Sequence, residues 1–239
     1  MKPTYINLTF ENFGETTEEQ KSKSVDMFNK VSCVLEKEWN LTFPVTIIVV
    51  ITSNEVFRED STEKDPASWK YCFLLRDQPD NKVYINVDLF NALPNETEIM
   101  IKHETAHIVV GQLVSDHSKY RMSHFLEEGT AGLDNATERL VSKMKRENIK
   151  NLPDPLTLLT LQDIKNLGGD TNKEPFIDQL GYLILFSFVD FLIQKNGREK
   201  IIAVYKALDN TTDLLPAYEK NCHKSLTKEA SEWKILVTR

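Results

Sequence analysis

Two histidines and a glutamate stand at a spacing that suits a catalytic metal site. The segment from Ile101 to His107 reads Ile-Lys-His-Glu-Thr-Ala-His and contains an HExxH motif. On a helix, residues i and i+4 share one face, so His103 and His107 can direct their imidazoles at one ion. Glu104 lies about 100° round the helix from His103. It can therefore accept a proton from a metal-bound water without binding the metal, as zinc-dependent hydrolysis requires.

The surroundings of the motif favour a metal site over two ordinary helix histidines. The segment from Pro94 to Glu98 predicts a helix start, with Asn95 as N-cap and Glu98 as its capping-box partner. The motif would then begin about two turns into a helix. Apolar residues on both sides predict a buried setting that is poor in water: Met100, Ile101, Ile108, Val109 and Val110.

A zinc site with an open catalytic position needs a third protein ligand. Five downstream residues are candidates: His117, His124, Glu127, Glu128 and Asp134. A metzincin would continue the motif with glycine and histidine where this chain has Val110 and Leu113, so that class is excluded. The GTxD pattern of aspzincins is a near miss, because Asp134 arrives two residues late and its carboxylate would be turned by about 200° on a helix.

The segment from Phe125 to Ala131, Phe-Leu-Glu-Glu-Gly-Thr-Ala, resembles the LxEGxA helix start of gluzincins. These are the thermolysin-like and aminopeptidase N-like zinc metallopeptidases. In that family the glutamate before the glycine is the third zinc ligand, so the resemblance implies Glu128. It follows His107 after 20 residues, slightly more than the family usually has. Glu127 is the alternative ligand, and one of the two is expected to be a solvated charge favoured by the helix dipole.

A second resemblance lies between Gln179 and Gly197. This segment is similar to the helix that follows the catalytic domain in bacterial gluzincins, and it matches at Tyr182, Ser187, Phe188, Val189, Phe191, Leu192 and Gly197. In aminopeptidase N-like relatives a tyrosine in this helix donates a hydrogen bond to the oxyanion, which implies that role for Tyr182. A buried core tyrosine is an equal alternative, because Ile184 and Leu185 replace the small or polar residues that usually follow.

Composition and charge limit the possible classes of protein. The chain has 239 residues, of which 41% are hydrophobic and 27% charged, as in ordinary soluble domains. A net charge of −7 without a basic cluster argues against nucleic acid as a partner. The most apolar run, from Leu180 to Val189, is too short to span a membrane. Three widely spaced cysteines and no signal-like N-terminus favour a cytoplasmic protein; a secreted protein whose leader has been removed is the alternative.

Hydrophobic periodicity predicts an α+β protein. Strands are expected at 4–10, 45–51, 69–75 and 82–87, and helices at 17–39, 96–114, 124–147, 160–167, 176–195, 198–208, 212–220 and 226–236. This order resembles the thermolysin-like fold: one catalytic unit, 1–239, with a mixed-sheet α/β lobe at 1–95, a mainly helical lobe at 96–239 and the zinc site between them. By that resemblance strand 69–75 is a free edge that pairs with peptide substrate; an ordinary edge strand guarded by Lys70 and Arg76 is equally compatible.

The sequence therefore predicts zinc-dependent hydrolysis of peptide bonds in a peptide or protein substrate. His103, His107 and Glu128 would hold Zn²⁺, Glu104 would be the general base, and Tyr182 would stabilise the oxyanion. The alternative is a catalytically inactive relative that serves as a binding or scaffold module. The intact Glu104 argues against that alternative, because a structural zinc site has no need of it. Substrate specificity, endo- or exopeptidase action and oligomeric state stay open.

Overall fold

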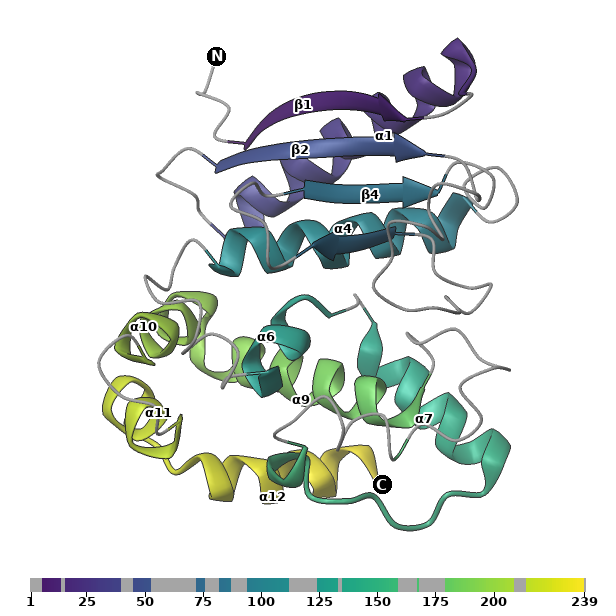
Figure 1. Cartoon of the computed structure of the whole chain (residues 1–239). Coiled ribbons are helices and arrows are strands. Elements are labelled where there is room, and N and C mark those ends of the chain that lie inside the picture. Colours follow the sequence, from purple (N-terminus) through teal and green to yellow (C-terminus); the bar gives the residue numbers. More distant parts are fainter. Residues whose placement is uncertain are drawn as a thin grey trace. The chain divides into compact units, whose positions relative to one another are not determined.

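The computed structural model describes residues 6–13, 16–39, 45–52, 72–75, 82–86, 94–111, 124–132, 135–158, 167, 179–208 and 214–238. The chain divides into two compact units, Met1–Val109 and Val110–Arg239. Their elements are shown in Figure 1. The predicted helix at 160–167 falls almost entirely outside the described residues. A search of the described helices finds none that combines the length and apolarity needed to cross a bilayer.

A four-stranded mixed sheet forms the centre of the first unit. Its strands run in the order β1-β2-β4-β3, with bounds Ile6–Phe13, Val45–Thr52, Lys82–Asn86 and Cys72–Leu75. β1, β2 and β4 are parallel, whereas β3 pairs with β4 in the antiparallel direction. Strands were predicted within a few residues of each of these positions, and the α+β class is confirmed.

One face of this sheet is mainly apolar. The register pairs Ile6 with Val45 and Val49 with Val83, so alternate residues of three strands point to the same side. Those buried residues are Ile6, Val45, Ile47, Val49, Ile51, Val83 and Ile85. Helix α1, Glu18–Glu38, covers this face. The ring of its Phe28 lies edge-on to the ring of Phe10, with 6.3 Å between the ring centroids. Val50 points to the opposite face and is also buried, so the central part of β2 is covered on both sides, as its continuous run of β-branched residues predicts.

Helix α4, Pro94–Gly111, lies beside α1 behind the sheet in Figure 1. Two ion pairs join the helices: Lys30 contacts Glu98 at 2.6 Å, and Lys102 contacts Glu38 at 2.9 Å. The predicted N-cap at Asn95 is wrong, because the helix begins one residue earlier at Pro94. Proline is favoured at a first helical position, where its missing N–H removes no hydrogen bond. Glu98 pairs with α1 and is not the capping-box partner that was expected.

The second unit is built around one apolar helix. Its elements are α6 (His124–Thr130), α7 (Ala136–Glu147), the 3₁₀ turn η1 (Pro155–Thr157), α9 (Leu180–Asn196), α10 (Arg198–Leu208), α11 (Leu214–Cys222) and α12 (Leu226–Val237). Helix α9 packs against α6, α7, α10 and α12. Every residue of α9 from Gly181 to Val189 is buried. The apolar run is therefore the central core helix of this unit.

The predicted helix over 124–147 is two helices, which corrects the sequence interpretation. α6 ends at Thr130, and α7 begins only at Ala136. Asn135, just before α7, has a left-handed backbone with φ 60°, a conformation that asparagine tolerates better than most residues. The N–H of Gly132 donates to the carbonyl oxygen of Gly129 at 3.3 Å, in the turn that ends α6. Apolar spacing continues across this break, so periodicity alone did not reveal it.

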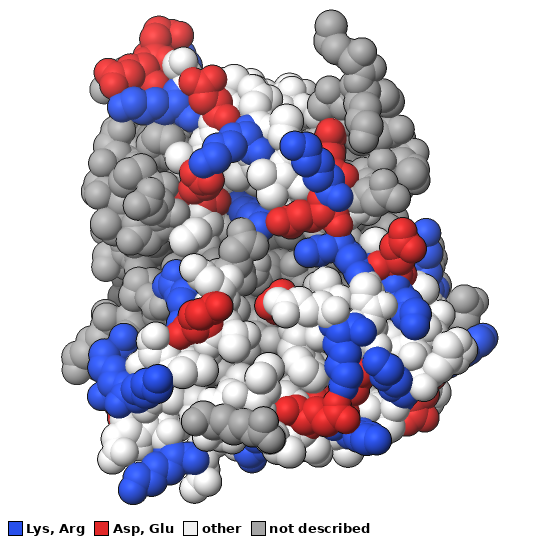
Figure 2. Space-filling model, turned by 180° about the vertical axis from the view of Figure 1, so that it is seen from behind, with Lys and Arg blue, Asp and Glu red and all other residues white. Residues whose placement is uncertain are grey.

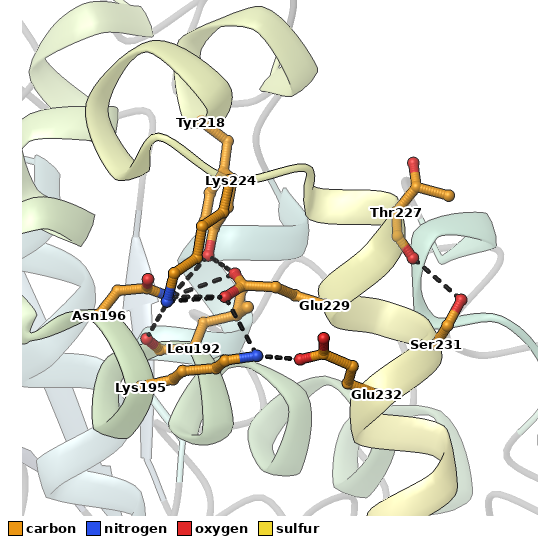
Figure 3. A network of polar contacts seen from close by, with 9 residues as sticks. All are labelled: Leu192, Lys195, Asn196, Tyr218, Lys224, Thr227, Glu229, Ser231 and Glu232. Carbon is orange, nitrogen blue, oxygen red and sulfur yellow. Dashed lines mark hydrogen bonds and ion pairs between the residues drawn. The ribbon is translucent and has the colours of Figure 1, made fainter.

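A buried polar cluster joins α9, α11 and α12 at the C-terminal end of the second unit (Figure 3). The carboxylate of Glu229, only 2% exposed, accepts hydrogen bonds from the hydroxyl of Tyr218 and from the amide of Asn196. The ammonium groups of Lys195 and Lys224 lie 3.6 and 3.5 Å from it and balance its charge. Burial, followed by the bond to Glu229, holds the pKa of the Tyr218 hydroxyl far above its usual value.

The surface carries both signs of charge. In the rear view of Figure 2, basic and acidic side chains alternate across the described surface with uncharged residues between them. Several are matched along their own helix, as in the pairs Lys23–Glu19 and Lys143–Glu147. Such exposed pairs are screened by solvent and mainly support their own helices.

Candidate metal centre

His103 and His107 face one another within α4. Both side chains are buried, at 3% and 2% exposure. Their Nε2 atoms lie 2.9 Å apart, and their ring planes are nearly perpendicular, at 89°. A tetrahedral zinc ion with bonds of ~2.0–2.1 Å holds two ligand nitrogens about 3.3 Å apart. The distance between the two Nε2 atoms would have to increase by only a few tenths of an ångström. The i,i+4 spacing has therefore produced a pair that can share one ion.

Apolar side chains enclose this pair on α4 itself. Ile101, Ala106, Ile108, Val109 and Val110 are all buried. The helix therefore has no broad polar face around the motif, as the sequence predicted. Burial matters for a metal site because it removes competing water and strengthens the electrostatic interaction between an ion and its ligands.

Glu104 differs from both histidines in its environment. It is only partly buried, and its carboxylate forms no hydrogen bond or ion pair with any residue that the structure describes. A carboxylate that is already bonded to a lysine or arginine would be a poor proton acceptor. The role of Glu104 as general base stays a prediction.

Glu128 is carried by α6, a helix of seven residues that is too short to be stable by itself. Its position must come from contacts with the rest of the second unit. The next residue, Gly129, lies directly against α9: a Cβ at this position would be 2.2 Å from Cγ2 of Val189 and 3.2 Å from the carbonyl oxygen of Leu185. Only glycine permits this approach. The glycine of the LxEGxA segment thus acts by close packing of two helices.

The three residues expected to bind metal form one buried group. One ligand atom each from His103, His107 and Glu128 can be chosen so that all lie within 4.8 Å of one another. Glu128 is 4% exposed, so all three side chains are buried. In tetrahedral coordination the ligand atoms lie about 3.3–3.5 Å from one another, so the ligand atoms of the three residues would have to approach by at most about 1.5 Å. Two imidazoles and a carboxylate fit a metal ion at this distance, and the group can bind one.

The other candidate ligands lie outside the described part of the chain. This applies to His117 and Asp134 and to the side chains of His124 and Glu127. Of the strand expected at 69–75, only Cys72–Leu75 is described, as β3. The assignment of Glu128 over Glu127 therefore stays a prediction from the resemblance, to which the geometry of Glu128 adds support.

Tyr182 has the surroundings of a core residue. It lies in the first turn of α9, is 7% exposed, and packs its ring 5.8 Å from that of Phe186. A buried ring is compatible with both sequence interpretations, because a tyrosine can place its ring in a core and its hydroxyl against a polar partner. The oxyanion role of Tyr182 stays a prediction.

Sequence reasoning did not identify two residues that support α6. The hydroxyl of Thr130 donates to the carbonyl oxygen of Leu126 at 2.7 Å and lies 2.8 Å from the hydroxyl of Tyr205, which belongs to α10. Tyr205 follows Thr130 by 75 residues. Nothing in the local sequence around either residue signals this pairing.

Comparison with known proteins identifies no relative. No protein-family model, no curated protein and no solved structure matches the chain. The resemblance to gluzincins therefore depends on the HExxH motif, the Glu-Gly segment and the Tyr182 segment.

Proposed function

We propose that this chain is a zinc metallopeptidase that hydrolyses peptide bonds in a peptide or protein substrate. The observation that carries the proposal is the buried group of His103, His107 and Glu128, with Glu104 next to the first histidine. A structural zinc site uses four protein ligands, whereas a catalytic site uses three and leaves one position for water or substrate. The three ligands found among the described residues, together with an adjacent carboxylate, match the catalytic type.

Zinc is the metal that this ligand set favours. Calcium and magnesium prefer shells made almost entirely of oxygen, while two imidazoles and one carboxylate are a recurrent set for catalytic zinc. An imidazole binds a metal through a nitrogen that carries no proton, so zinc binding competes with proton binding at these side chains. The same set can accept other divalent transition metals, so metal content is the first quantity to measure.

In the proposed reaction, Glu104 moves the proton. His103, His107 and Glu128 would hold a zinc ion, which would supply Lewis acidity to a water molecule and to the substrate carbonyl. Glu104 accepts a proton from the attacking water and then passes it to the departing amine nitrogen. Tyr182 would donate a hydrogen bond to the oxygen that becomes negative.

We further propose that the chain is a gluzincin with a thermolysin-like catalytic fold. Support comes from the order of its elements: a mixed sheet, a helix with HExxH, a short helix that begins near the proposed third ligand, and then a helical bundle. The Glu-Gly pair on α6 provides a second point of similarity, because its glycine has a defined packing role.

The proposed function is tested by separating metal binding from turnover. Glu104→Gln should retain about one zinc per chain yet lose hydrolysis by at least about a thousandfold, because an amide cannot accept the proton. Glu98→Gln is a matched control: it makes the same change on the same helix, at a residue whose partner is Lys30. Zinc content and cleavage of a mixed peptide library, with and without chelator, should be measured on all three proteins.

The outcomes distinguish the candidate functions. Near-normal turnover by Glu104→Gln would remove that residue from the mechanism. Zinc bound by the wild-type chain without cleavage of any peptide would favour the inactive binding or scaffold module. Retention of stoichiometric zinc after replacement of both His103 and His107 by alanine would refute the site itself.

A further inference from the structure

Two hydroxyl groups, those of Thr130 and Tyr205, form hydrogen bonds that connect α6, the helix that carries Glu128, to α10. The hydroxyl proton of Thr130 is used in the bond to the carbonyl oxygen of Leu126, at 2.7 Å. A hydroxyl has a single proton, so the 2.8 Å contact between Thr130 and Tyr205 must have Tyr205 as the donor. The order of donation is therefore Tyr205 to Thr130 to Leu126.

These bonds act on the side of α6 opposite to the proposed metal ligand. Leu126 and Thr130 are four residues apart and share one face of the helix. Glu128 lies midway between them in sequence, about 200° round the helix from each. Fixing the Leu126–Thr130 face therefore sets the rotation of α6 about its axis, which in turn sets the direction of the Glu128 side chain.

The contact of α6 with α9 and its bond to α10 constrain different motions of the helix. Gly129 fixes the distance between α6 and α9, because its α-carbon lies against Val189. A glycine contact has no side chain that could lock into α9 and resist rotation. Tyr205 supplies a directional bond from a third helix, α10, and its ring is completely buried, so the hydroxyl has a defined position.

We propose that Tyr205 is a positioning residue for the metal centre: its hydrogen bond to Thr130 orients α6 so that Glu128 points at the ion. This inference rests on the proposed function, in that it takes Glu128 to be a metal ligand. Tyr205 touches neither the ion nor the substrate in this role. Its effect should therefore be seen in metal affinity and should depend on the presence of Glu128.

The experiment measures zinc affinity of the full chain by competition with a chromophoric chelator, together with thermal unfolding in excess chelator. Tyr205→Phe removes one oxygen and should weaken zinc binding about 10–100-fold, the usual effect of losing a residue that orients a ligand. Thr130→Val, which breaks the same chain of bonds while keeping the side-chain shape, should weaken it similarly. Thr130→Ser, which keeps the hydroxyl, should restore the affinity to within about threefold.

Two controls separate orientation from general stability. Tyr218→Phe removes a hydroxyl from another fully buried tyrosine of the same unit, whose partner is Glu229. This variant should unfold at a lower temperature yet bind zinc like the wild type. In a Glu128→Ala background, Tyr205→Phe should change the remaining zinc affinity less than about twofold, because the ligand that it orients is gone.

The possible results assign failure to one proposal or the other. Tight zinc binding by the wild type with unchanged affinity in Tyr205→Phe and Thr130→Val would overturn the positioning role and leave the metal site intact. A loss that persists fully in the Glu128→Ala background would also overturn it, since Tyr205 would then act on stability alone. Absence of zinc binding by the wild type would refute the metal site, and the inference with it.

Discussion

The close approach of α6 and α9 leads to a quantitative prediction for Gly129→Ala. The added methyl group would lie 2.2 Å from Cγ2 and 2.7 Å from Cβ of Val189. Carbon atoms in contact are ordinarily about 3.5–4.0 Å apart, so the shortfall is roughly 1.5 Å. A new rotamer of Val189 cannot remove it, because the Cβ contact does not depend on the rotamer. The helices must therefore separate, and α6 must move with the adjacent Glu128.

The expected cost is the difference between two effects. Overpacking of a close contact destabilises a protein by about 1–3 kcal/mol, and this contact is at the severe end of that range. Alanine is a better helix former than glycine by ~1 kcal/mol, which offsets part of the loss. We expect a net decrease in the free energy of unfolding of about 2 kcal/mol. Zinc affinity should fall by more than tenfold, because the displacement exceeds the tolerance of a metal–ligand bond.

The assay is chemical denaturation of the metal-free chain, combined with a zinc competition titration. Gly197→Ala is the matched control: its methyl group would meet no atom within 4 Å, but its φ of +86° is unfavourable for alanine. It should lose about 1 kcal/mol through backbone strain alone and should bind zinc normally. If Gly129→Ala is as stable as the wild type and binds zinc equally well, the close packing of α6 on α9 does not position Glu128.

A second substitution tests whether the contact itself is responsible. Val189→Ala removes the Cγ2 atom that makes the shortest contact, although the 2.7 Å contact to Cβ remains. The double variant of Gly129→Ala and Val189→Ala should therefore lose less stability than the sum of the two single variants, by about 1 kcal/mol. Strict additivity would show that the clash is relieved elsewhere.

Three further predictions follow from individual side chains. Tyr182→Phe should lower kcat about a hundredfold at unchanged zinc content if its hydroxyl meets the oxyanion; full activity with a reduced melting temperature would make it a core residue. Cys33 is exposed, whereas burial raises the pKa of the Cys222 thiol, so iodoacetamide should alkylate Cys33 in the native protein and Cys222 only after unfolding, as mass spectrometry can resolve. The pKa of Tyr218 in the folded chain is raised above its ordinary 10.0, so its contribution to stability is complete below that pH and is lost as the pH rises above it. Chemical denaturation between about pH 8 and 11 should therefore show a smaller alkaline loss of stability in Tyr218→Phe than in the wild type.

Features set by neighbours in the sequence were predictable. The pairing of His103 with His107 depends only on helix geometry, and their Nε2 atoms indeed lie 2.9 Å apart. The β-branched run from Val45 identified a buried strand, because continuous apolar runs occur where both faces of a strand are covered. The apolar segment that begins at Leu180 was recognised as too short for a membrane, and it forms the core helix of its unit.

Boundaries were harder to predict, because competing local signals have similar strength. Asn95 is a good N-cap by type, yet the helix begins at Pro94, and Glu98 bonds to Lys30 from α1. Apolar spacing carried the predicted helix straight through Asn135, where the chain turns with a left-handed residue. A difference of one helical turn or one cap changes the free energy by only about 1 kcal/mol, which tertiary contacts readily outweigh.

The sequence by itself determined the histidine pair on which the proposed chemistry depends, since an i,i+4 pair with an intervening glutamate is a property of one helix. Only the tertiary structure brought Glu128 into the same buried group and showed why its neighbour must be glycine. The bond from Tyr205 to Thr130 could not be anticipated, because it spans 75 residues and joins two hydroxyls that have no distinctive local pattern. Helix geometry repeats along the chain and can be read from spacing, whereas the orientation of α6 depends on which distant side chains pack against it.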